Sequence, residues 1–327
     1  LCLKPAWADP LPGTKPLKLE GDITSQLVDG VDRFLLGQLA DSIDNRAAHW
    51  RRDLSPPEAY LKSVAPNRAR LAVITGVVDK RVMAQDIDAL QVIVKSGSPS
   101  VARGDTVRIT NIRWKSIRNL HGEGLMLDPT RVANRNSVAI IVIPDAGQTP
   151  EMLCGISEGL PPAQQYALRL AESGCRVFVP SIISRHYEGR NGRAKMTSRE
   201  FAYRSAYELG RQLIGYEIQK SLALLDECDR KSDGEETRYA VMGWGEGGML
   251  ALYAAALDER IDVACVSGYF DSRQDIWQEP ISRNVFGLLE QFGDAEIATL
   301  VAPRKLIVEM AAGPEFDVPS EGGARVL

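Results

Sequence analysis

The residues with the clearest chemical potential lie in the stretch VMGWGEGG, Val241–Gly248. Gly243, Gly245 and Gly248 fit G-x-G-x-x-G, in which glycines let a backbone approach a dinucleotide pyrophosphate. That pattern also needs an acid about 20 residues further on, and Asp271 follows Gly248 by 23 residues. The same stretch fits G-x-S-x-G-G, the strand-to-helix turn that presents a serine nucleophile, with the serine replaced. The stretch therefore has two interpretations.

Trp244 fixes the register of the second interpretation. The nucleophile turn is so tight that the residues two before and two after its apex must be small. With Glu246 at the apex, Trp244 would occupy one of those positions. With Gly245 at the apex, the two positions hold Gly243 and Gly247. The nucleophile position therefore holds Gly245, which has no side chain that could attack an ester.

Two backbone N–H groups are expected to face the apex of such a turn as an oxyanion hole. The residue after the apex, Glu246, supplies one of them, and its carboxylate favours the N-terminus of the following helix. The second comes from the loop after the first long buried strand, PDAGQTPE (144–151), where Ala146 or Gly147 is the candidate donor.

A catalytic acid and a histidine base should follow the nucleophile in that order along the chain. The loop after the last predicted strand offers Glu315 and Asp317 as the acid. The histidines at positions 49, 121 and 186 all precede the turn. The sequence as given thus lacks both the nucleophile and the base.

The elements that position these residues are read from hydrophobic periodicity. Helical spacing extends from Asp22, a plausible N-cap, to about His49, and a short second helix begins at Pro56–Pro57. Strands are predicted at 70–78, 107–114, 123–129, 137–144, 175–183, 238–243, 261–270 and 304–310, with helices at about 198–228 and 246–257. An antiparallel start followed by alternating strands and helices predicts an α/β fold, with a mostly parallel central sheet flanked by helices.

The segment 241–270, together with FGDAEIATLVAPRKLIVE (292–309) and the helical segment 199–227, carries a family resemblance. It resembles bacterial dienelactone-hydrolase-like and acetyl-xylan-esterase-like proteins of the α/β-hydrolase superfamily, over about residues 105–312. The resemblance implies the α/β-hydrolase fold and a carbohydrate ester or other small acyl ester as substrate. No cofactor is expected, and three histidines without paired spacing disfavour a metal site. The sequence departs from the family at Gly245, where serine is expected.

The resemblance also includes long exported proteins with two hydrolase-like units in tandem, of which the first is degenerate. It implies a domain with a structural or ligand-binding role, and a tandem hydrolase-like domain beyond residue 327. One alternative is an active carboxylic-ester hydrolase with an unorthodox nucleophile, or with a nucleophile in a missing segment. Another alternative is a dinucleotide-binding oxidoreductase that uses Gly243, Gly245 and Gly248.

The start of the chain predicts export to the periplasm or the outside of a bacterial cell. Ala6-Trp7-Ala8 fits the small-residue site of signal peptidase. We therefore expect a signal-peptide remnant and linker at 1–20, a helical N-terminal extension at 21–66 and the hydrolase domain at 67–327, which ends in loop composition. No apolar run reaches the ~18 residues of a membrane span, and the net charge of −4 disfavours nucleic acid.

The segment RHYEGRNGRAK (185–195) gathers Arg185, His186, Arg190 and Arg193 after a predicted strand. Ligands bind at the carboxyl ends of the strands in such folds, so these residues are candidates for the capture of an anionic ligand. A flexible polar loop with Gly189 and Gly192 is the preferred explanation of these residues.

The long predicted helix carries charges at helical spacing. Arg204–Glu208, Glu208–Arg211 and Glu217–Lys220 are predicted as ion pairs on a solvated face.

Overall fold

The computed structural model describes residues 12–15, 18–82, 91–92, 100–130, 138–189, 195–230 and 237–315. Its strands are β1 Gln91–Val92, β2 Ser100–Arg103, β3 Val107–Ile117, β4 Leu120–Pro129, β5 Val138–Ile143, β6 Arg176–Pro180, β7 Tyr187–Gly189, β8 Lys195–Thr197, β9 Arg238–Trp244, β10 Ile261–Ser267 and β11 Lys305–Glu309. Its α-helices are α1 Ile23–Asn45, α2 Pro57–Thr75, α3 Pro150–Leu153, α4 Tyr166–Glu172, α5 Ser198–Glu208, α6 Leu213–Arg230, α7 Glu246–Leu257 and α8 Asp294–Val301. Short 3-10 helices are η1 Arg46–His49, η3 Pro162–Gln164, η5 Ile276–Gln278, η6 Ile281–Arg283 and η7 Leu288–Glu290.

The main sheet has the order β1-β3-β4-β6-β5-β9-β10-β11, with β2 paired to β3. The pairs β3–β4 and β4–β6 are antiparallel, whereas β6, β5, β9, β10 and β11 run parallel. This arrangement confirms the predicted antiparallel start and parallel continuation. β5 pairs with both β6 and β9, and its apolar run is buried as expected for a central strand. β7 and β8 form a separate hairpin.

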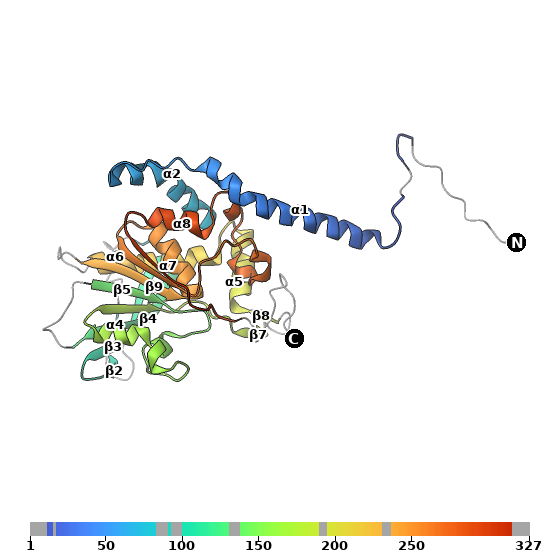
Figure 1. Ribbon diagram of the computed structural model, residues 1–327. Coiled ribbons are helices and arrows are strands. Elements are labelled where there is room, and N and C mark those ends of the chain that lie inside the picture. The colour runs from blue at the N-terminus through green and yellow to red at the C-terminus, as the bar shows by residue number, and fades with distance from the viewer. Residues whose placement is uncertain are drawn as a thin grey trace.

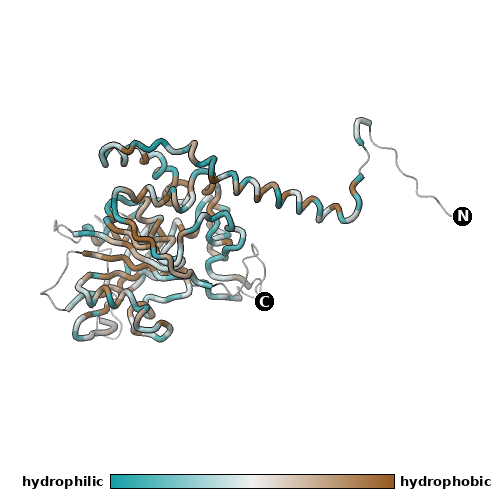
Figure 2. The backbone as a smooth tube through the Cα atoms, in the orientation of Figure 1, coloured by the Kyte–Doolittle hydropathy of each residue, from teal (hydrophilic) through white to brown (hydrophobic). Residues whose placement is uncertain are grey.

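Helices cover both faces of the sheet (Figure 1). One face packs against α6, α7 and α8, with α2 against α7 and α8, and the other face packs against α3 and α4, so that two apolar clusters form. The central strands carry the apolar residues that Figure 2 shows in brown. α7 is apolar on all sides because it is enclosed by the sheet, α2, α6 and α8. Its predicted range, 246–257, is confirmed.

α1 begins at the predicted N-cap, because the Asp22 carboxylate accepts from the N–H groups of Thr24 and Ser25. The helix extends away from the sheet and has no buried residue (Figure 1). None of the helices in the described ranges is both long and apolar enough to cross a bilayer.

The chain joins the body of the molecule where α1 ends. The Trp50 ring meets Phe292 edge-on with centroids 5.6 Å apart, and its indole N–H donates to the carbonyl of Gln291 at 3.0 Å. Arg46 donates to the carbonyl of Leu289 at 3.1 Å. The packed part of the structure therefore begins before residue 67, the predicted start of the hydrolase domain.

The prediction of a strand at 70–78 is wrong, because α2 continues to Thr75. Leu71 and Ile74 are buried on one side of this helix, while Val73 is 56% exposed. The three-residue spacing of Leu71 and Ile74 is helical, but the neighbouring β-branched residues favoured the prediction of a strand. The left-handed φ of +76° at Gly76 ends the helix.

The single helix predicted at 198–228 is also wrong, since α5 ends at Glu208 and α6 begins at Leu213. Gly210 has a φ of +68°, which a continuous helix does not allow. The chain turns here, and α5 lies beside η6 instead of extending α6.

The predicted ion pairs on these helices are replaced by others. Arg204 pairs with Glu200 at 2.7 Å, and Arg211 pairs with Asp79 at 3.0 Å. Glu217 is only 1% exposed, so the prediction that it lies on a solvated face is wrong. It points into the protein, where it meets Arg199.

Candidate active site

Three loops converge where the order of the sheet reverses. From β5 the chain passes to β6 on one side, and later to β9 on the other. In open α/β sheets, ligands bind in the crevice outside the carboxyl ends of the strands at such a point. Here the loop after β5 meets Gly245, which follows β9, and the loop after β11 lies across both. The Trp244 indole N–H, which donates to the carbonyl of Ala312 at 2.9 Å, holds that last loop in place.

Gly245 is the apex of the turn between β9 and α7, with φ +59° and ψ −120°. A β-carbon at Gly243 would lie 2.2 Å from the carbonyl carbon of Gly247. One at Gly247 would lie 2.0 Å from the carbonyl oxygen of Ile143. Both flanking positions therefore require glycine, as the register argument from Trp244 predicts.

The space above the apex is filled. A β-carbon on Gly245 would lie 2.6 Å from Oδ1 of Asp145 and 2.9 Å from Cδ of Pro314. Contacts under 3.0 Å force a shift of the neighbours. The position from which a nucleophile would project is thus occupied by an acidic side chain and a proline ring.

Asp145 binds both backbone groups that the sequence predicts as oxyanion donors. Its Oδ1 accepts from the N–H of Glu246 at 2.9 Å, and its Oδ2 accepts from the N–H of Gly147 at 2.8 Å. Arg185 completes the arrangement with two donated bonds of 2.5 and 2.7 Å to the same carboxylate. The carboxylate is 2% exposed, so it is held almost entirely by protein donors. The neighbouring Ala146 uses its carbonyl to accept from the N–H of Arg185 at 3.0 Å.

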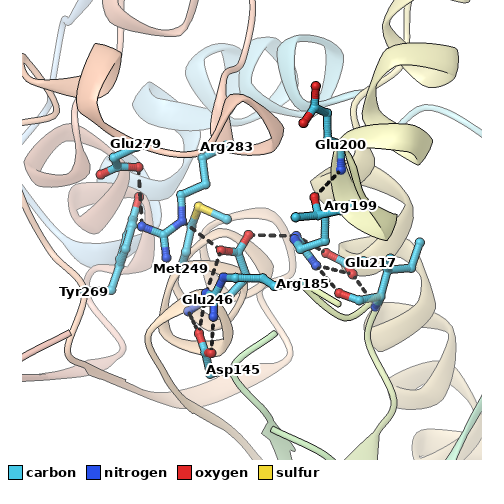
Figure 3. Close-up of polar contacts among 12 residues, drawn as sticks. Asp145, Arg185, Arg199, Glu200, Glu217, Glu246, Met249, Tyr269, Glu279 and Arg283 are labelled. Atoms are coloured by element: carbon cyan, nitrogen blue, oxygen red, sulfur yellow. Dashed lines mark hydrogen bonds and ion pairs between the residues drawn. The ribbon is translucent and has the colours of Figure 1, made fainter. Parts of the chain in front are cut away.

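Glu246 lies at the centre of a buried charge network (Figure 3). Its carboxylate accepts from Arg199 at 2.7 Å and from Arg283 at 2.8 Å. Arg185 lies 3.6 Å away on a third side. Arg199 also donates to both oxygens of Glu217, at 2.9 and 2.8 Å. The carboxylates of Asp145, Glu217 and Glu246 are thereby matched by arginines.

The arginines determine the charge state of Glu246. Burial by itself would raise the pKa of this carboxyl, but Arg199, Arg283 and Arg185 together lower the pKa to about 2. Burial by itself would lower the pKa of Arg199. The negative charges of Glu217 and Glu246 outweigh this effect and raise the pKa of Arg199 above its ordinary value. Glu246 and Arg199 are therefore both charged near neutral pH.

Comparison with solved structures agrees with this topology. A Bacteroides fragilis protein described provisionally as an acetyl xylan esterase superposes with a TM-score of 0.60 and 18% identity, over 79% of this chain and 70% of that one. The methylesterase BT1017 superposes with a TM-score of 0.53 and 16% identity, over 82% of this chain and 55% of that one. The chain has the α/β-hydrolase fold.

Comparison with protein sequences finds a match over a smaller part of the chain than the structural comparison does. YtaP of Bacillus subtilis (strain 168), named provisionally as a hydrolase, is 34% identical over 102 residues. That match spans 29% of this chain and 34% of the length of YtaP. No protein-family model matches the chain.

Of the remaining predicted site residues, Arg185 lies in the site, and the others are exposed or lie outside the described residues. Glu315 is exposed in the loop that crosses the site, and Asp317 lies outside the described residues. Arg185 is turned inward onto Asp145 and is 20% exposed, whereas the neighbouring His186 is exposed. Arg190 and Arg193 also lie outside the described residues. His49 and His121 are exposed at the end of η1 and in β4.

Glu309, at the end of β11, is bound to the end of the neighbouring strand. Its Oε2 accepts from the hydroxyl of Ser267 at 2.5 Å. This bond ties the last two parallel strands together at the edge where the loops converge.

Neither a cation nor a pyrophosphate fits the site as it stands. The carboxylates of Asp145, Glu217 and Glu246 already bind guanidinium groups, so a metal ion would have to displace arginines. A pyrophosphate at the N-terminus of α7 would meet the negative charges of Asp145 and Glu246. The geometry therefore disfavours the dinucleotide interpretation of the three glycines.

Sequence reasoning missed the residues that fill the site. Asp145 stands in the quoted PDAGQTPE loop, and an acid directly after a buried strand could have drawn attention to it. Arg199 and Arg283 come from α5 and η6, which are distant in sequence from the turn. No local pattern marks these arginines, because only the folded chain brings them to Glu246.

Proposed function

We propose that this chain is a catalytically inactive α/β-hydrolase domain of ester-hydrolase lineage with a structural or ligand-binding role. The observation that carries the proposal is the Asp145 carboxylate, which accepts from the N–H groups of Glu246 and Gly147 directly above Gly245. The apex has no nucleophilic side chain, and the donors that would stabilise a developing oxyanion already hold an anion.

Displacing Asp145 to admit a substrate carbonyl is energetically unfavourable. The carboxylate would lose two backbone bonds and the paired bonds from Arg185. Breaking a buried ion pair typically costs about 3–5 kcal/mol. A neutral carbonyl makes weaker hydrogen bonds than the carboxylate that it would replace. The geometry therefore favours the closed arrangement over a substrate complex.

The competing proposal is an active ester hydrolase with an unorthodox nucleophile. The acidic side chains near the apex that could serve as this nucleophile are Asp145 and Glu246. Both carboxylates are engaged by arginines and are almost fully buried. The pKa of Glu246 near 2 makes its carboxylate a weak base and a weak nucleophile. Neither side chain has the free, desolvated oxygen that attack on an ester requires.

Hydrolysis of 4-nitrophenyl acetate tests the proposal. We expect wild type to show no saturable turnover, and Asp145→Asn and Glu246→Gln to release 4-nitrophenol at the same rate as wild type. Asp105→Asn, at an exposed turn, is the matched control for the amide substitution. Saturable turnover by wild type that either site variant abolishes would overturn the proposal. Glutamine is preferred to alanine at 246 because alanine would leave the arginines facing a void.

The substrate class and the location of the protein stay predictions. The acetyl xylan esterase and methylesterase neighbours suggest that a ligand of this domain is a carbohydrate ester or a carbohydrate. Export rests on Ala6-Trp7-Ala8, which lie outside the described residues. Mass spectrometry of the protein from the native host would reveal the mature N-terminus.

A further inference from the structure

A hollow of about 350 Å³ opens between α5 and the segment 273–289, apart from the Gly245 turn. Four aromatic side chains, Tyr203, Tyr207, Trp277 and Phe286, line it together with aliphatic residues. The Asp145 carboxylate and the α7 N-terminus do not belong to its lining. The hollow is therefore a second feature, independent of the closed site.

Three of the four aromatic rings form a connected surface. Tyr203 and Tyr207 have ring centroids 5.6 Å apart, and Tyr207 and Phe286 meet edge-on at 6.5 Å. Trp277 is 59% exposed and Phe286 is 75% exposed. Large aromatic groups gain about 1.5–3 kcal/mol when they are fully buried, so their joint exposure around a hollow marks a binding surface.

Polar atoms at the hollow have no hydrogen-bond partner within the described structure. They are Oδ1 of Asn284 and Nε of Arg273, and both are buried. Arg273 itself is only 3% exposed, and its other nitrogens are engaged by the hydroxyl of Tyr269 and the carbonyl of Arg283. A buried unpaired polar group costs about 1–3 kcal/mol.

We propose that this hollow binds a neutral oligosaccharide. A pyranose ring presents an apolar C–H face that stacks on aromatic rings and a rim of hydroxyl groups. Each hydroxyl both donates and accepts, so hydroxyl groups can exchange hydrogen bonds with the side chain of Asn284, which lines the hollow. The proposal stands whether or not the Gly245 turn catalyses, because binding here involves no bond cleavage.

The charges around the hollow favour a neutral sugar over an acidic one. Arg273 is the charged residue of the lining, and the buried Asp294 acts on it electrostatically from the protein side. The hydroxyl of Tyr269 bridges the two, since it accepts from Arg273 and donates to Asp294 at 3.0 Å. The positive charge of Arg273 is thus balanced by Asp294 inside the protein. An acidic sugar would therefore gain little attraction from Arg273.

Isothermal titration calorimetry on the full chain tests the proposal, with xylohexaose, cellohexaose and mannohexaose as probes. We expect saturable binding of at least one probe, with affinity reduced about tenfold or more in Trp277→Ala and in Phe286→Ala. Phe34→Ala removes an equally exposed phenylalanine on α1, 64% exposed, and should leave the affinity unchanged.

Three results would overturn the proposal. One is the absence of heat from all three probes at millimolar concentration. Another is binding that Trp277→Ala and Phe286→Ala leave unchanged. Because both side chains are mostly exposed, the variants should retain the wild-type circular dichroism spectrum. A tri-galacturonate that binds more tightly than every neutral probe would also contradict it.

Discussion

At the scale of single residues, Gly245 and Asp145 account for the state of the site. The apex glycine provides space and a left-handed φ of +59°, and the aspartate fills the space and binds the donors. Each feature supports the other. A larger apex residue would collide with Asp145, and an open apex without Asp145 would leave two backbone N–H groups without their present acceptor.

Gly245→Ala should therefore lower the free energy of unfolding by about 3 kcal/mol or more, which combines backbone strain with overpacking. Gly210→Ala is the control, because Gly210 also has a positive φ, +68°, but nothing lies within 4 Å of its added β-carbon. It should cost only about 1–2 kcal/mol. Urea unfolding measures both values, and equal losses would show that Asp145 and Pro314 move aside freely.

Arg199 offers a second residue-scale prediction. Arg199→Met would leave Glu217 and Glu246 without their shared partner in a buried site, which costs about 3–5 kcal/mol. Arg204→Met removes the Arg204–Glu200 pair, whose arginine side chain is 47% exposed, and should cost less than about 1 kcal/mol. The comparison of the two urea midpoints checks the argument. A loss as small for Arg199→Met as for Arg204→Met would contradict it.

At the scale of elements, close backbone contacts determine how the helices meet. α6 crosses the end of α2 at Gly215, where a β-carbon would lie 2.0 Å from the carbonyl oxygen of Thr75. This contact involves backbone and cannot relax by a change of rotamer. It fixes the end of α2 as part of a packed helix, where the sequence had predicted a strand from residue 70.

Gly215→Ala should thus separate α2 from α6 and destabilise the protein by about 2 kcal/mol or more. Gly37→Ala, in the exposed α1, has nothing within 4 Å of the added β-carbon. Alanine favours a helix over glycine by about 1 kcal/mol, so this control should leave the unfolding midpoint unchanged or raise it. Far-UV circular dichroism during thermal unfolding distinguishes the two variants. A Gly215→Ala protein as stable as wild type would refute the close-contact argument.

At the scale of the whole molecule, buried charges make stability depend on pH in two opposite ways. The pKa of Glu246 is lowered to about 2 in the folded protein. The ionised carboxylate therefore stabilises the fold at pH values above the ordinary pKa of glutamate, and this stabilisation is lost as the pH falls through 2. Asp294 behaves in the reverse sense. Burial raises its pKa to about 6, partly offset by Arg273. Its contribution is complete below its ordinary pKa and is lost as pH rises through 6.

The free energy of unfolding of wild type relative to Asp294→Asn should therefore fall between pH 4.5 and pH 7. The expected change is on the order of 2 kcal/mol, because the folded protein holds a proton that the unfolded chain has lost over much of this range. Urea unfolding at the two pH values measures it. A difference between wild type and variant that is constant or grows with pH would contradict the prediction.

Much of the fold follows from the sequence alone. The apolar runs of β5, β6, β9 and α7 are local signals of burial, so their residue ranges predict the parallel sheet. The glycines around Trp244 predict the turn and its register, because steric limits on such a turn act between near neighbours. The sequence fails at α2 and at the break between α5 and α6, where tertiary packing and a left-handed glycine decide the outcome.

The sequence by itself determined that the apex of this turn is a glycine, because residue identity and short-range sterics suffice for that. Only the tertiary structure decided what occupies the space above it. Asp145, Arg185 and Glu246 come from three different segments, and electrostatic contacts between segments leave no periodicity in the chain. The aromatic hollow has the same origin, since α5 and the segment 273–289 meet only in the folded protein.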